Sequence, residues 1–174
     1  MDWGRRADVR EMKTHSATGR VASLHLHPEK PGAPLLAVEV IHVVTDKGIE
    51  ENSRYFGRVS RSTGQPGRRQ ISLIEREQIT EHAAELGLPS IPPGAVRANI
   101  ETTGMDLPSL IGQEVGVGGA VLFFYEARTP CAKMDLLCAG LRERMEHGRQ
   151  GVLAEVRKSG AIRVGDALRP RPTS

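Results

Sequence analysis

Residues 115–126 of this 174-residue chain read Val115-Gly116-Val117-Gly118-Gly119-Ala120-Val121-Leu122-Phe123-Phe124-Tyr125-Glu126. Glycines divide this stretch into a pair of strands, because glycine in a strand marks a tight bend or a close approach of two backbones. The apolar run at its end favours a buried strand, since aromatic and β-branched side chains suit a pleated surface. The stretch therefore predicts a β-rich protein.

Further strands are predicted on both sides of this pair. They cover Gly19 to Leu26, Leu35 to Val44, Val152 to Val156 and Ala161 to Val164, and the last two are expected to form a closing hairpin. Residues 49–69 show no sustained period and predict a long irregular loop, which in a compact domain is often functional or disordered.

Two helices are predicted among the strands. Ser72-Leu73-Ile74-Glu75 has the pattern of a capping box, which would start a helix from about Glu75 to Leu86. A second helix is expected from Ala132 to about Glu146, because its apolar positions share one face. Many short strands with few short helices and no internal repeat predict a mostly β fold, either an antiparallel barrel or a sandwich.

The composition is that of one ordinary globular domain over residues 1–174, with 39% hydrophobic and 26% charged residues and a net charge of +3. Residues 1–15 and 169–174 are expected to fray at the ends. Only 3% of the residues are aromatic, which disfavours nucleic-acid binding by base stacking. The sequence shows no membrane span and no signal peptide, so we expect a cytoplasmic protein.

The two cysteines have different expected roles. Cys131 follows a strand end and a proline and precedes the second predicted helix, with Arg128 and Lys133 nearby. A helix N-terminus and flanking cations stabilise a thiolate, so Cys131 is the leading candidate for chemistry, although a cytosolic cysteine is more often a small buried hydrophobe. Cys138 lies on the apolar face of that helix and is predicted to be a core residue, too far from Cys131 for a disulfide.

Polar and basic residues suggest a binding pocket. The loop from Ala98 to Leu107 offers amide, hydroxyl and carboxyl groups that can orient a ligand, or can cap their own turn. We predict that Arg69, Arg97 and Arg128 converge on one concave pocket with Asn99 and Thr102, because guanidinium groups suit a phosphate. His25 and His27 share a strand face, but without a third ligand two ordinary histidines are favoured over a metal site.

A series of short motifs in order resembles the MOSC domain family, which is named for the C-terminal domain of molybdenum cofactor sulfurases and includes stand-alone bacterial proteins. The motifs cover most of the chain. They are Gly48-Ile49, Arg69-Gln70-Ile71-Ser72-Leu73-Ile74, Pro93-Gly94 to Leu107, Arg128-Thr129-Pro130-Cys131 and Gly160 to Asp166. The closest match is Arg-Thr-Pro-Cys followed by a helix that ends near Met145.

This resemblance implies a mostly antiparallel β-barrel that binds the molybdenum cofactor (molybdopterin). Cys131 would then carry sulfur to a metal–sulfur centre or contact the metal, and Arg69, Arg97, Asn99, Thr102 and Arg128 would hold the pterin phosphate. The implied partners are a cysteine desulfurase that depends on pyridoxal phosphate, as sulfur donor, and a molybdoenzyme, as acceptor. Pyridoxal phosphate itself is expected to belong to the separate desulfurase.

Two departures from the family pattern leave alternatives open. After Gly48-Ile49-Glu50 the family usually shows Gly-Asp-Arg-His, whereas this chain continues with Glu51-Asn52-Ser53-Arg54. In the family a glutamate often precedes the Asn-Ile pair, whereas this chain has Ala98 at that position. The chain is therefore either a sulfurtransferase-like sulfur carrier or a non-catalytic module that holds an anionic cofactor or a partner protein, with Cys131 merely lining the pocket.

Overall fold

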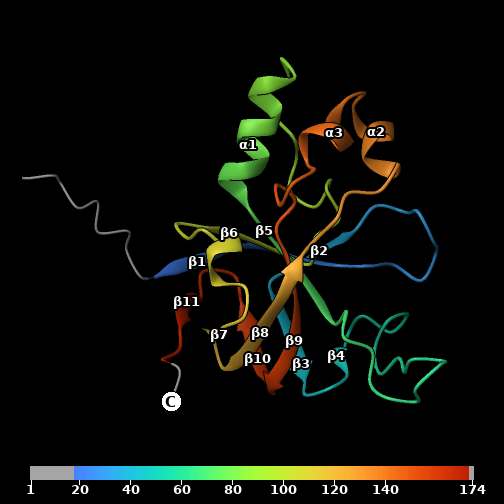
Figure 1. Ribbon diagram of the computed structural model, residues 1–174, viewed down its shortest axis with the longest axis vertical. Helices are drawn as coiled ribbons and strands as arrows, with labels where there is room; N and C mark the ends of the chain where they lie inside the picture. Colours follow the sequence, from blue (N-terminus) through green and yellow to red (C-terminus); the bar gives the residue numbers. More distant parts are fainter. Residues whose placement is uncertain (1–17, 173–174) are drawn as a thin grey trace, which may run out of the picture.

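The computed structural model describes residues 18–172 (Figure 1), so the expected fraying of residues 1–15, 173 and 174 lies outside the described residues. Helices are α1 (Arg76–Glu85), α2 (Lys133–Leu137) and α3 (Leu141–Arg144), with a 3-10 turn η1 (Pro108–Leu110). Strands are β1 (Gly19–Leu26), β2 (Leu36–Val38), β3 (Val40–Val44), β4 (Gly48–Ile49), β5 (Ile71–Glu75), β6 (Ile100–Thr103), β7 (Glu114–Val117), β8 (Ala120–Ala127), β9 (Val152–Lys158), β10 (Gly160–Arg163) and β11 (Ala167–Pro170).

The main sheet closes into a barrel. Its strands follow the order β11-β7-β8-β9-β5-β6-β1, and β1 pairs with β11 to complete the ring. Neighbouring strands are antiparallel except for β5 and β6, which are parallel. β2 pairs with β1, while β10, β3 and β4 form a small separate sheet. Closure removes exposed strand edges, and the predicted mostly β, mainly antiparallel barrel is confirmed.

The stretch that predicted the fold forms the β7–β8 hairpin. Val117 pairs with Ala120 across Gly118 and Gly119, and the apolar run of β8 continues against β9. Inside the barrel, side chains such as Leu73, Leu122 and Phe124 are fully buried. This interior forms the larger of two hydrophobic clusters and provides most of the burial that holds the ring together.

A smaller cluster lies under the helices, which stand above the barrel in Figure 1. Ile79 and Ala83 of α1 pack with Ile74, Val96 and Met134. None of the helices among residues 18–172 has the length and apolar character needed to cross a membrane.

Two local predictions are wrong. Ser72 to Glu75 is not a capping box but part of the buried strand β5, and α1 begins at Arg76 with no side-chain cap. Burial between β6 and β9 outweighs the local capping pattern there. The expected helix from 132 to 146 is broken into α2 and α3, because Cys138 is extended and Gly140 has a positive φ of 88°.

Three other expectations differ in pairing or extent. The predicted closing hairpin is absent: β9 is flanked on both edges by β5 and β8, so β10 pairs with β3 instead. The strand predicted from Leu35 to Val44 is divided into β2 and β3. Arg169 and Pro170, expected to fray, lie in β11 and pair with β7.

The glycine at 151 provides a test of the packing between the start of β9 and β5. Gly151 has a φ of +77°, and a Cβ there would lie 1.9 Å from the Leu73 carbonyl oxygen, whereas Gly148 has a φ of +79° and open space around it. Both changes to alanine strain the backbone by about 1 kcal/mol, but Gly151→Ala adds an overpacking cost of about 2 kcal/mol or more. Urea unfolding of both variants measures this difference, and equal losses of stability would contradict the packing described.

Candidate anion-binding site

His27, directly after β1, lies among positively charged side chains. Its pKa is lowered from 6.5 to about 4, first by burial and then by Arg97, Arg128, Arg69 and Arg54 in order of decreasing effect. Arginines that are far apart in sequence therefore act on one imidazole, and they keep it neutral at neutral pH. The backbone amide of His27 donates to Asn52 Oδ1 at 2.7 Å, while His27 Nδ1 is buried without a hydrogen-bond partner.

Arg128 is the most buried of these arginines, with 6% of the residue exposed. It follows β8, where its amide donates to the Gly151 carbonyl. Its Nη2 donates to the carbonyl oxygens of Val96 and Arg97, at 3.0 and 3.1 Å, and thereby joins the end of β8 to the loop before β6. Its Nη1 is buried without a partner. The side chain is thus held on one side and has a free donor on the other.

The charge of Arg128 is not balanced by a carboxylate. Burial lowers the pKa of Arg128 to about 10, with further lowering by Arg69 and Arg97 and an opposing effect of Cys131. It therefore remains charged at neutral pH. Within residues 18–172, neither Arg128 nor Arg69 nor Arg97 forms an ion pair with a carboxylate. A buried positive charge without a counter-ion is costly, so the site is complementary to an anion.

A cavity of about 420 Å³ lies beside these groups. Its lining includes His27, Asn52, Tyr55, Arg58, Arg68, Arg69, Ser72 and Asn99. Arg69 is exposed and lies two residues before the start of β5. Arg97 has a φ of 63° and donates from Nη1 to the Ala33 carbonyl at 2.9 Å. The structure thus brings Arg69 and Asn99 to the cavity and places Arg97 and Arg128 within electrostatic range of His27 beside it.

Asn99 and Thr102, unlike Arg128, present no free hydrogen-bonding group to the cavity. Asn99 Oδ1 accepts from the amide and hydroxyl of Ser72, and its Nδ2 donates to the His25 carbonyl. Its side chain therefore fixes the β1, β5 and β6 ends rather than presenting free groups. Thr102 is fully buried and lies on the same strand face as Ile100 of the barrel core, so it faces the interior and does not line this cavity.

Cys131 is exposed, whereas Cys138 is partly buried and packs against the cluster under the helices. Cys131 acts electrostatically on Arg128, so its sulfur lies near the cationic site. α2 begins at Lys133 and has only five residues, which leaves less helix dipole beside Cys131 than the expected long helix would supply. The structure therefore identifies Arg128 as the main cation near the Cys131 thiol.

The sequence did not single out His27, Asn52 and Tyr55 as pocket residues. The Tyr55 ring meets the His27 ring edge-on at 5.0 Å, and the guanidinium groups of Arg54 and Arg58 lie 5.1 and 4.9 Å from the Tyr55 ring centre. The one available signal was the long arginine-rich loop at 49–69. For the alternative of a histidine metal site, the described residues hold no group of three ligand-type side chains suitable for a metal.

A family model for the MOSC domain matches residues 23–169, which span the barrel and the cationic site. The chain belongs to the MOSC domain family. It is 31% identical over 124 residues to YuaD of Bacillus subtilis (strain 168), which is described as a candidate metal-sulfur cluster biosynthesis protein. The alignment covers 63% of this chain and 64% of YuaD, so it spans somewhat less than two thirds of that relative.

Crystal structures show the same fold at lower identity. YuaD from Bacillus subtilis superposes with a TM-score of 0.71 at 22% identity and covers 87% of this chain and 94% of its own. YiiM from Geobacillus stearothermophilus superposes with a TM-score of 0.64 at 17% identity, covering 88% of this chain and 75% of its own. YiiM from Escherichia coli superposes with a TM-score of 0.62 at 18% identity, covering 90% of this chain and 69% of its own. Family membership associates the chain in general with molybdenum and metal–sulfur cofactors.

The cationic environment of His27 predicts a measurable titration. Because the pKa of His27 is about 4 in the folded chain and 6.5 when unfolded, folding stability falls as pH drops from about 6.5 to about 4. Replacing Arg97 by glutamine removes the largest charged contribution and should raise the pKa of His27. NMR titration of the imidazole measures it, with the exposed Arg142→Gln as control. A wild-type pKa near 6.5 would contradict the arrangement.

Proposed function

We propose that this MOSC protein binds the phosphate-bearing pterin of the molybdenum cofactor at the cationic site and carries sulfur on Cys131. The proposal rests on the Nη1 donor of Arg128, which is buried without a hydrogen-bond partner. The arginines around it are not neutralised by any carboxylate of the described residues. An anion supplies both the missing hydrogen-bond partner and the missing charge. Charge-assisted bonds from guanidinium groups to phosphate are among the stronger polar contacts in proteins.

The residues present fit a phosphate-bearing ring system. Arg128 and Arg69 would bind the phosphate, and the neutral His27 would donate or accept a further hydrogen bond depending on its tautomer. Tyr55 and the guanidinium groups stacked on it provide a flat face at the cavity. The cavity volume of about 420 Å³ falls in the range of small-molecule sites. The cofactor is the substrate in this proposal, and its metal centre receives the sulfur.

Cys131 would act by thiol exchange. Its thiolate attacks the terminal sulfur of a donor persulfide, R–S–SH; the donor S–S bond breaks, R–S⁻ leaves, and Cys131 becomes a persulfide. Release of the carried sulfur as sulfide requires two electrons. A thiol reductant, R′SH, supplies them: two R′SH and the persulfide give the Cys131 thiol, H₂S and R′S–SR′. The sulfide is then available to the metal centre.

The exposure of Cys131 supports transfer between proteins, because another protein's sulfur must reach it directly. The proposed donor is a cysteine desulfurase that depends on pyridoxal phosphate, and the proposed acceptor is a molybdoenzyme. Both reactions belong in a reducing compartment where free thiols persist, so we propose a cytoplasmic setting.

A non-catalytic binding module is the second candidate. It is favoured by the short α2 beside Cys131 and by the departures from the family at Glu51, Asn52 and Ala98. Asn52 is nevertheless engaged in holding the His27 amide, and Ala98 is fully buried. The two candidates share the anion site and differ only in whether Cys131 accepts sulfur.

Sulfur transfer to Cys131 distinguishes the two candidates. Incubation with a persulfide donor should add one sulfur atom to Cys131 in the wild type and in Cys138→Ser, because Cys131 is exposed and Cys138 is partly buried. Mass spectrometry of the intact protein and its peptides locates the added mass. If Cys131→Ser takes up as much sulfur as the wild type, the carrier role must be abandoned in favour of the binding module.

The anion site predicts a specific loss of binding. Arg128→Met should weaken binding of molybdopterin or inorganic phosphate by about tenfold to a hundredfold, as expected for truncating a desolvated charge contact. The exposed Arg69→Gln should weaken it by a smaller factor and tests the site without disturbing the core. Titration calorimetry measures the affinity of both variants, with Arg142→Met as control. Unchanged affinity in both variants would exclude this site.

A further inference from the structure

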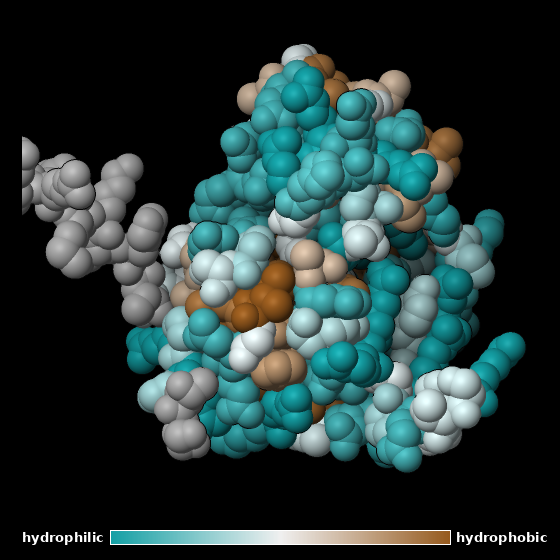
Figure 2. Space-filling view, in the orientation of Figure 1, coloured by the Kyte–Doolittle hydropathy of each residue, from teal (hydrophilic) through white to brown (hydrophobic). Residues whose placement is uncertain are grey.

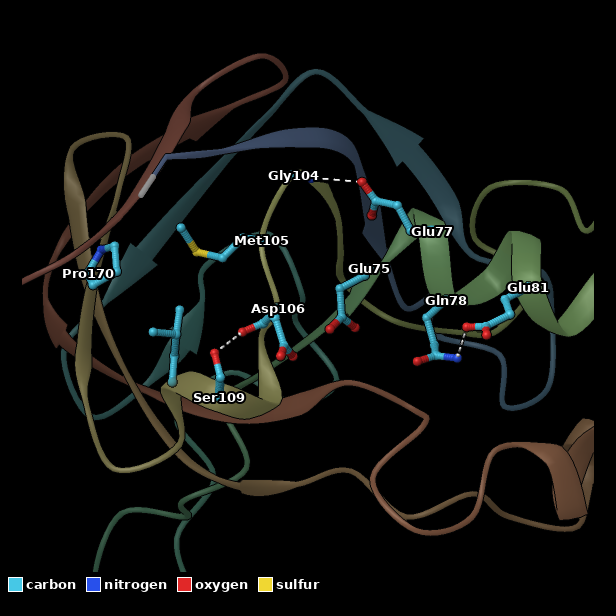
Figure 3. A pocket seen from close by; sticks show the side chains of 10 residues that line it. Glu75, Glu77, Gln78, Glu81, Gly104, Met105, Asp106, Ser109 and Pro170 are labelled. Carbon is cyan, nitrogen blue, oxygen red and sulfur yellow. Dashed lines mark hydrogen bonds between the residues drawn. The ribbon is translucent and has the colours of Figure 1, made fainter. Parts of the chain in front are cut away.

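A second hollow opens at one mouth of the barrel and shares no lining residue with the cationic cavity. Its volume is about 800 Å³, and we call it the acidic groove. It lies between the start of α1, the loop from β6 to η1, and β11 (Figure 3). The side chains that define it are Glu75, Glu77, Glu81, Met105, Asp106 and Leu110. The proposed sulfur chemistry does not use any of them.

Glu75 is the unusual member of the acidic groove. Only 7% of the residue is exposed, and its Oε1 accepts from the Leu107 amide at 3.0 Å while its Oε2 has no hydrogen-bond partner. Figure 3 shows its carboxylate turned toward that of Asp106. Burial, together with Asp106 and Glu77, raises the pKa of Glu75. A buried carboxylate oxygen without a donor is a costly feature that a bound cation or donor would relieve.

Thr102, beside Glu75, provides a second buried polar atom without a hydrogen-bond partner. It is the register partner of Glu75 in the parallel pair of β5 and β6, so both side chains leave the sheet on the same side. Its Oγ1 is also buried without a hydrogen-bond partner. This residue, expected from sequence to join the arginines, therefore belongs to the floor beneath the acidic groove.

The other carboxylates are partnered only by neutral groups. Glu77 Oε1 accepts from the Gly104 amide at 2.8 Å, and Glu81 Oε2 accepts from Gln78 Nε2 at 3.1 Å. Among residues 18–172, Glu75, Glu77, Glu81 and Asp106 form no ion pair. Unbalanced negative charge thus collects at this mouth, although the chain as a whole has a net charge of +3. The acidic groove is complementary to a cation.

One wall of the acidic groove is apolar. Met105 and Leu110 are partly buried and pack against the barrel core, and Pro170 completes this side. Figure 2 shows a hydrophobic patch on the face formed by the segment between β6 and β7. A bare metal ion would gain nothing from this wall, and the described residues hold no three-ligand metal group. An extended organic cation would bury its stem there.

We propose that the acidic groove binds an organic cation, a guanidinium or primary ammonium group on an apolar stem. Asp106 contacts the cationic head at the surface, Glu75 beneath it strengthens the negative field, and Met105 and Leu110 pack against the stem. The same chemistry is presented by a free alkyl amine or guanidine and by a lysine or arginine side chain of a polypeptide. The site is independent of sulfur transfer at Cys131.

NMR titration of the full chain at low salt tests this site with two cationic probes, agmatine and the capped peptide Ac-Leu-Arg-Leu-NH₂. The same peptide with citrulline in place of arginine is the neutral control. Amide shifts are expected at Gly104, Leu107 and Leu110, with the citrulline peptide at least about tenfold weaker. Asp106→Asn, an exposed change that should not disturb folding, and Glu75→Gln should each weaken cation binding by about fivefold or more.

The outcomes separate the two sources and can reject the site. Equal affinity for agmatine and the arginine peptide assigns it to a free cation, whereas binding of the peptide alone assigns it to a polypeptide side chain. Glu143→Gln, an exposed change outside the acidic groove, should bind like the wild type. The proposal is overturned if neither cation binds at millimolar concentration, if citrulline binds as well as arginine, or if Asp106→Asn leaves binding unchanged.

Discussion

Arg128 holds a positive charge at a point where the residue is only 6% exposed, and one of its guanidinium nitrogens has no partner. The bonds from its other nitrogen to the carbonyls of Val96 and Arg97 fix the loop that leads into β6. Cys131 lies three residues farther on in the chain, close enough to act electrostatically on this guanidinium. The cationic site, the thiol and the connection between barrel and helices therefore all depend on how one buried guanidinium is held.

The barrel makes this arrangement possible because its closure brings distant segments together. His27 follows β1, Arg69 precedes β5 and Arg97 precedes β6, and the pairing of β1 with β6 and of β6 with β5 places these three strand ends side by side. Asn99 bonds to Ser72 and to the His25 carbonyl, and so locks the three ends to one another. A rigid frame of this kind lets several like charges approach, at a cost that a bound anion would reduce.

Elements with a strong local signal could be predicted from sequence. β1 has the predicted bounds of Gly19 to Leu26, and the glycine-divided β7 and β8 pair as expected. Errors arose where non-local burial decided the outcome: Ser72 to Glu75 has a local helix-start pattern, yet its four residues are buried in β5. In the same way, Thr102 follows Asn99 closely in sequence, but strand alternation directs its side chain into the barrel.

The pocket residues were harder to predict than the fold. Cys131 and the three arginines stand in recognisable motifs, but the importance of His27 comes from charges contributed by Arg54, Arg69, Arg97 and Arg128, which only the folded chain brings near it. Likewise, Glu75 is an ordinary glutamate in sequence, and its raised pKa comes from burial beside Asp106, which only the folded chain produces.

Anomalous diffraction from crystals soaked in tungstate, a heavy-atom analogue of phosphate, would locate a bound oxyanion at the cationic site. We expect a tungsten peak beside the cavity, with an oxyanion oxygen at hydrogen-bonding distance from Arg128 Nη1 and close to His27. An empty cationic site beside peaks that lie only at other surface arginines would contradict it.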